Sequence, residues 1–77
     1  MSDEELKVYF EIFNECWKFF KKYSNPQDNE GFWNELIEDL ENKTKKYKNY
    51  EFARKMLIQT EEEIEELLRR KGKNETN

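Results

Sequence analysis

The chain has 77 residues, enough for one domain near the lower size limit at which an apolar core alone holds a fold. One cysteine and no histidine exclude a disulfide framework and argue against a zinc site of the usual kind. The 18 acidic and 14 basic residues give a net charge of -4, which argues against a general nucleic-acid-binding protein.

The first predicted helix covers residues 3–23. Ser2 and Glu5 form an S-x-x-E capping box directly before an apolar run with helical period. The main stripe of that run consists of Leu6, Tyr9, Phe10, Phe13, Cys16, Trp17, Phe20 and Tyr23. Val8, Ile12 and Phe19 form a second stripe on its flank, which widens the apolar arc to about 200°.

Two further helices are predicted, over 30–46 and 50–71. Pro26 disfavours helix at Asn25, and Asn29 or Asp28 can cap the helix that follows. Residues 46–49 form a weaker break with no Gly or Pro. The apolar faces on either side of it are well over 100° out of phase, which favours a turn capped by Asn49 over one continuous helix.

Three amphipathic helices joined by short loops predict an all-α, up-down-up three-helix bundle. Gly72 is well placed to end the third helix as its C′ residue, so we expect a single domain over 1–72 and a frayed polar tail over 73–77. An unbroken helix over 30–71 would indicate an intertwined dimer instead. The predicted core is Phe13, Trp17, Phe20, Trp33, Leu36, Leu40, Met56, Leu57, Ile64 and Leu67.

The composition predicts a protein that is not an enzyme and has no cofactor. Without histidine, nucleophile and base pairs of the Ser-His or Cys-His type cannot be built. A bundle of this size also leaves little room for a substrate pocket. The acidic N-terminus lacks the pattern of a signal peptide, and no apolar run is long enough to span a membrane, so we expect a cytoplasmic protein.

Surplus apolar surface on the first helix is the main indication of a partner. Val8, Ile12 and Phe19 are the candidate surface, because a helix in a three-helix bundle usually needs a narrower apolar arc. A two-fold pairing of this flank would bury it on both copies of a homodimer. The alternative is that the first helix lies centrally and both neighbours cover the flank.

A second candidate surface is a basic pole where the first and third helices end. An up-down-up bundle brings together Lys18, Lys21, Lys22, Arg69, Arg70, Lys71 and Lys73. Such a pole could bind phosphate groups, although basic residues are also common in the last turn of any helix. Five glutamates between residues 61 and 66 argue against the third helix as a DNA-recognition helix and read as a solvated face.

Several segments together show a resemblance to known sequences. They are Cys16-Trp17-Lys18-Phe19-Phe20-Lys21-Lys22-Tyr23, Phe32-Trp33, Lys46-Tyr47, Phe52-Ala53 and Leu67-Leu68-Arg69-Arg70. The arrangement is similar to short uncharacterised proteins encoded by gut Firmicutes, often in phage-like or conjugative elements. The resemblance implies a bacterial, cytosolic, helical protein with no assigned activity, and it supplies no functional residues.

The sequence thus predicts a non-enzymatic protein-interaction module that self-associates and serves as a small accessory or regulatory protein. The alternative function is nucleic-acid association through the basic pole. The two functions differ in their response to salt, because phosphate contacts weaken steeply as salt rises and an apolar interface tolerates it.

Overall fold

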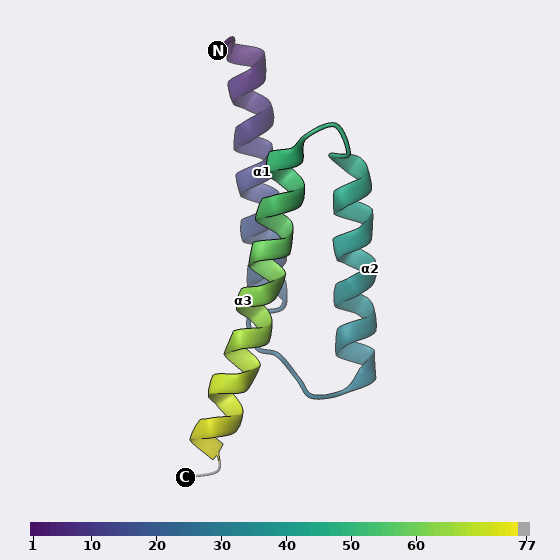
Figure 1. Cartoon of the computed structure of the whole chain (residues 1–77), viewed down its shortest axis with the longest axis vertical. Helices are drawn as coiled ribbons and strands as arrows, with labels where there is room; N and C mark the ends of the chain where they lie inside the picture. The colour runs from purple at the N-terminus through teal and green to yellow at the C-terminus, as the bar shows by residue number, and fades with distance from the viewer. Residues whose placement is uncertain (76–77) are drawn as a thin grey trace.

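The computed structural model describes residues 1–75, and the side chains of residues 1–72. It contains three helices in chain order, α1 (Asp3–Lys22), α2 (Glu30–Lys46) and α3 (Glu51–Glu75). α1 and α3 run in the same direction and α2 runs opposite to them, and α3 packs against both other helices (Figure 1). No strand occurs within residues 1–75. The predicted all-α three-helix bundle is confirmed.

The starts of α1 and α2 are fixed by the predicted caps. The Ser2 hydroxyl accepts a hydrogen bond from the Glu5 backbone N–H at 3.1 Å, and the Glu5 carboxylate accepts one from the Ser2 backbone N–H at 3.4 Å. Asn29 caps α2, since its Oδ1 accepts from the Phe32 N–H at 2.8 Å. Both caps satisfy N–H groups that have no partner inside the helix.

The two ends of α3 differ from the prediction. The Tyr50 carbonyl accepts from the N–H groups of Ala53 and Arg54, so Asn49 lies one residue too early to be the N-cap. At the other end α3 continues through Gly72 to Glu75, and no glycine of the described chain has positive φ. The sequence beyond Gly72 begins with polar residues, which offer no apolar contact to support a left-handed C-cap there. Residues 73–75 are thus helical, and residues 76–77 of the predicted tail lie outside the described residues.

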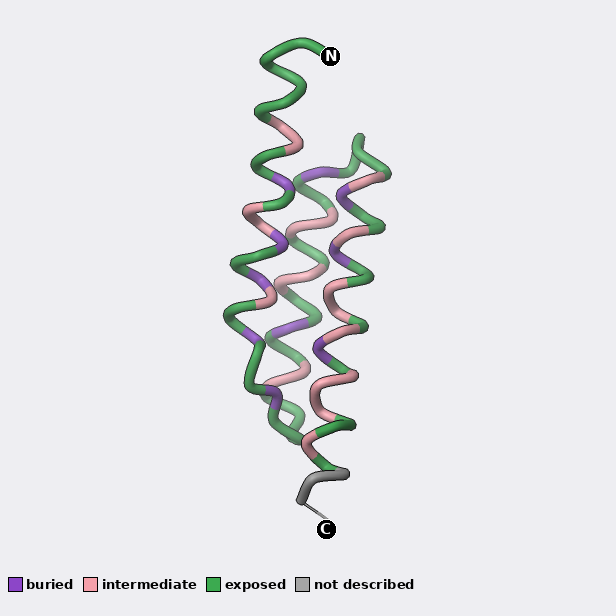
Figure 2. Tube along the Cα trace, turned by 90° about the vertical axis from the view of Figure 1, so that its left-hand side faces the viewer, coloured by how far each residue is buried: buried purple, intermediate pink, exposed green. Residues whose placement is uncertain are grey.

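The core consists of two buried clusters, each built from all three helical regions (Figure 2). The first cluster lies toward the start of α3 and contains Ile12, Cys16, Tyr47, Ala53 and Leu57. The second lies toward the end of α1 and contains Phe19, Tyr23, Leu36 and Ile64. α3 contributes to both clusters, which agrees with its contact to both neighbours.

The predicted core is confirmed at three positions of α2 and α3 and is wrong for part of α1. Leu36, Leu57 and Ile64 are buried as predicted. Phe20, Trp33, Leu40, Met56 and Leu67 are partly buried. The prediction is wrong for Phe13 and Trp17, which are 54% and 58% exposed, and it omitted the buried Ile12 and Phe19.

Ion pairs between α1 and α2 favour this orientation of α1. Glu15 lies 3.5 Å from Lys43 Nζ and 3.8 Å from Lys46 Nζ. Lys22 Nζ lies 2.9 Å from Asp39 and 3.2 Å from Glu35. At about 100° per residue, Glu15 and Lys22 stand on the flank of α1 beside Ile12 and Phe19. Turning this flank toward α2 brings Ile12 and Phe19 into the core and moves the opposite flank outward.

Tyr23 anchors the end of α1 to α2 within the same network. Its hydroxyl donates a hydrogen bond to the Asp39 carboxylate, and its ring packs edge-on against Phe32 at 5.4 Å between centroids. Burial and the bond to Asp39 raise the pKa of Tyr23 to about 12. Burial acts to raise the pKa of Asp39, but the bonds from Tyr23 and Lys22 outweigh it and hold that pKa below its usual value. The network therefore keeps Asp39 ionised next to the second cluster.

Candidate functional site

The candidate site is a row of exposed apolar side chains along one edge of α1. Leu6, Phe10, Phe13 and Trp17 are 54%, 69%, 54% and 58% exposed, and we call this row the α1 seam. Its steps of four, three and four residues are those of a heptad repeat, the spacing with which one helix pairs along another. The α1 seam lies roughly 100–160° around the helix from Ile12, so its residues share an edge that turns away from the core.

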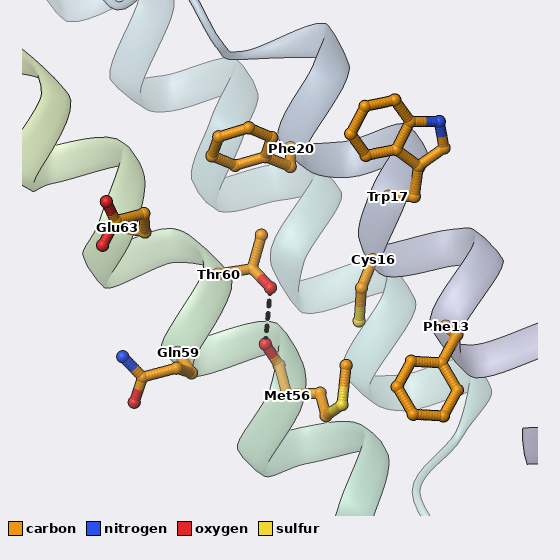
Figure 3. Close-up of a pocket in the computed structure, with 8 residues that line it drawn as sticks. All are labelled: Phe13, Cys16, Trp17, Phe20, Met56, Gln59, Thr60 and Glu63. Atoms are coloured by element: carbon orange, nitrogen blue, oxygen red, sulfur yellow. Dashed lines mark hydrogen bonds between the residues drawn. The ribbon is translucent and has the colours of Figure 1, made fainter.

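The α1 seam forms one wall of an open groove between α1 and α3. The groove has a volume of about 370 Å³ and is lined by Phe13, Cys16, Trp17, Phe20, Met56, Gln59, Thr60 and Glu63. Cys16 from α1 and Met56 from α3 point toward one another between the helices (Figure 3). Above this floor, Phe13 packs edge-on against Phe52 of α3 at 5.4 Å, and Trp17 stacks with Phe20 at 6.5 Å. The groove is therefore an apolar trough with aromatic walls.

The polar groups of the groove are poorly placed for chemistry. Burial raises the pKa of the Cys16 thiol, which keeps it in the protonated, unreactive form at neutral pH. The Thr60 hydroxyl donates to the Met56 carbonyl at 2.7 Å, as Figure 3 shows. Glu63 is ion-paired with Arg70 at 3.6 Å. The lining thus suits binding of an apolar surface better than catalysis.

The surface predicted from Val8, Ile12 and Phe19 needs correction. Ile12 and Phe19 are each 1% exposed and belong to the two core clusters, while Val8 packs against the first cluster. They are covered within the chain because α1 turns this flank toward α2 and α3. The apolar excess of α1 is real, but it lies on the α1 seam. The heptad spacing of the α1 seam was the sequence signal that could have located it.

The seven residues of the predicted basic pole do not form one free cationic surface. Lys22 pairs with carboxylates of α2, and Arg69 and Arg70 pair with Glu66 at 2.8 Å and 3.6 Å. α3 extends past the end of α1 (Figure 1), and Lys71 lines a pocket with Pro26–Asp28 of the loop between α1 and α2. The side chain of Lys73 lies outside the described residues. Lys18 and Lys21 are exposed on α1. Nucleic-acid association itself stays a prediction.

Comparisons with protein-family models, with curated proteins and with solved structures found no match to this chain. Among the described helices, none has the length and apolar character needed to cross a bilayer. Nor do three His, Cys, Asp or Glu side chains gather in that part of the chain in a way that could hold a metal ion.

Glu61, in the acidic run over residues 61–66, has a strongly shifted pKa. Ile64 is fully buried in the second cluster, and the glutamates around it stand at different depths. Partial burial of Glu61, together with repulsion from Glu65 and Glu62, raises the pKa of Glu61 to about 7 from 4.5. Glu61 therefore retains a proton in the folded chain at pH values where the unfolded chain releases it.

We expect Glu61→Gln to reduce the pH dependence of stability. Because the folded pKa is the higher one, the stability due to protonated Glu61 is fully present below about pH 4.5 and is lost as the pH rises through about 7. At pH 8 the variant should be more stable by about 0.3–0.5 kcal/mol, the size of a like-charge pair four residues apart on a helix. Urea unfolding at pH 5 and pH 8 measures this difference. Glu38→Gln, at an exposed position of α2, is the control, and an equal gain there would contradict the assignment.

Proposed function

We propose that the protein is a non-enzymatic protein-interaction module whose binding face is the α1 seam and the adjoining groove. The observation that supports this proposal is that four large apolar side chains in heptad spacing all remain more than half exposed. A small bundle gains stability by burying such residues, and contiguous exposed apolar patches on soluble proteins mark interaction sites.

The shape of the face indicates the kind of partner. A trough between two parallel helices accepts a third helix, whose apolar residues enter at steps of three and four. Phe13 and Trp17 on α1, with Phe52 and Met56 on α3, provide the aromatic and thioether surface that interfaces favour. The partner surface would therefore be the apolar face of an amphipathic helix, and the role that of an accessory or regulatory protein that acts by docking.

A photo-crosslinking amino acid placed at Phe10 tests the binding face in cells of the native host. Phe10 is 69% exposed, so the replacement leaves the core intact. We expect the crosslinking group at position 10 to give a discrete adduct with a partner protein. The same group at Lys18, an exposed position on another side of α1, should give far less of this adduct. Equal labelling from the two positions would contradict a binding face on the α1 seam.

A further inference from the structure

We propose that the occupant of the α1 seam is a second copy of this chain, with the two α1 helices antiparallel. This inference rests on the proposed function of the α1 seam and adds the identity and direction of the partner. It follows from the order of apolar and charged residues along α1, because that order is self-complementary in only one of the two directions.

The apolar residues match when the helices run in opposite directions. With the two-fold axis between Phe10 and Phe13, Leu6 lies opposite the partner's Trp17 and Phe10 opposite the partner's Phe13. The smallest side chain of the α1 seam thus meets the largest, and the thickness of the interface is even along its length. A parallel pair would place Trp17 on the partner's Trp17 at one end and Leu6 on the partner's Leu6 at the other.

The charges at the outer edge of the α1 seam select the same direction. Asp3 and Lys21 are 18 residues apart, which is five full helical turns, so both stand on the same line along α1. Both are exposed, and neither takes part in the ion pairs found within residues 1–72. Antiparallel pairing places Asp3 next to the partner's Lys21 and Lys21 next to the partner's Asp3. Parallel pairing would place like charges together at both ends.

The arrangement of α1 and α3 leaves room for this pairing. α1 begins well beyond the start of α3 (Figure 1), so the first turns of α1 extend past the other helices of the same chain. Phe52 of α3 contacts both Tyr9 and Phe13, which places it level with the middle of the α1 seam and close to the two-fold axis. Ile64 packs with Phe19 and Tyr23 at the far end of α1, so the acidic run of α3 lies away from the axis. The acidic runs of the two copies therefore do not face each other.

The exposed apolar area of the α1 seam is sufficient for a dimer of moderate affinity. Large apolar side chains bury about 150–250 Å² each, and the four residues of the α1 seam are slightly more than half exposed, so one copy offers on the order of 500 Å². Two copies together reach the roughly 1,000 Å² expected of a specific interface, before any contribution from Phe52 and Met56. An interface of this size lies at the small end of specific complexes, and we expect a dissociation constant in the micromolar range.

A charge-swap cycle measured by sedimentation equilibrium tests both the partner and the direction. We expect Asp3→Lys and Lys21→Asp each to weaken dimerisation by roughly tenfold, because each converts two attractive contacts per dimer into repulsive ones. The double variant should return to within about threefold of the parent protein. Within one chain the two residues are about 27 Å apart along α1, so coupling between them must come from the other copy.

The controls are Glu4→Lys and Lys18→Asp, which make the same charge changes at exposed positions of α1 away from the α1 seam, and they should leave the dissociation constant unchanged. A parent protein that is monomeric at about 100 μM would overturn the second copy as occupant. If the effects of Asp3→Lys and Lys21→Asp on the dissociation constant simply add in the double variant, the antiparallel direction is overturned. A monomeric parent protein leaves the crosslinking at position 10 intact, with an adduct to a different protein, whereas additive effects leave the adduct between two copies of this chain. Loss of that adduct would overturn the proposed function itself.

Discussion

Phe19→Ala is expected to lower the free energy of unfolding by about 3–5 kcal/mol, the largest loss from any single truncation on α1. Phe19 is 1% exposed and packs edge-on against Tyr23 at 5.3 Å in the second cluster, so its removal leaves a cavity that the helices can fill only in part. Trp17→Ala removes a larger side chain but should cost less than about 1 kcal/mol, since Trp17 is mostly in solvent.

Urea unfolding followed by circular dichroism measures this pair of variants. The protein concentration must be below the dissociation constant of any dimer. Association would stabilise the folded chain, and Trp17→Ala would then lose stability by weakening the dimer as well as the monomer. If Phe19→Ala is unfolded even without urea, the milder variant Phe19→Leu takes its place in the comparison with Trp17→Ala. A larger loss for Trp17→Ala than for Phe19→Ala would mean that the described orientation of α1 is wrong.

Phe10→Lys is expected to weaken dimerisation at least 100-fold while leaving the monomer folded. In the proposed dimer each copy loses one buried ring, worth about 1.5–3 kcal/mol, and a lysine is brought to the middle of an apolar interface. In the monomer Phe10 is 69% exposed, so the same change has little to disturb. Sedimentation equilibrium and circular dichroism together measure both effects.

The matched control for Phe10→Lys is Ile37→Lys on α2. Ile37 is also an apolar side chain that is about half exposed, at 49%, but it lies outside the α1 seam. Its replacement should leave the dissociation constant of the dimer within about threefold of the parent value. Equal weakening by both variants would show that added positive charge, rather than the loss of a seam residue, drives dissociation.

The starts of α1 and α2 could be predicted from the sequence because local groups determine them. Ser2, Glu5 and Asn29 act within three residues of the N–H groups that they satisfy, so their effect is visible in a short stretch of sequence. The end of α3 was predicted wrongly from Gly72 alone, because the polar residues that follow Gly72 offer no apolar contact to support a C-cap and α3 continues to Glu75.

The orientation of α1 could not be predicted from a short stretch of sequence. Its apolar arc is wider than two neighbours can cover, so hydrophobic period alone leaves open which part faces inward. The ion pairs that favour the observed orientation join Glu15 and Lys22 to Lys43 and Asp39, which lie 28 and 17 residues further along the chain. The sequence therefore showed that α1 has surplus apolar surface, but assigned that surface to Ile12 and Phe19 instead of Phe10 and Trp17.

The central position of α3 has a consequence for synthesis on the ribosome. Ala53 and Leu57 complete the first cluster and Ile64 completes the second, so neither cluster can close around α1 and α2 alone. A nascent chain that has emerged only through α2 would expose Ile12, Phe19 and Leu36 as well as the α1 seam. Until α3 follows, such a chain presents far more apolar surface than the finished protein, and it is then that a chaperone would have most to bind.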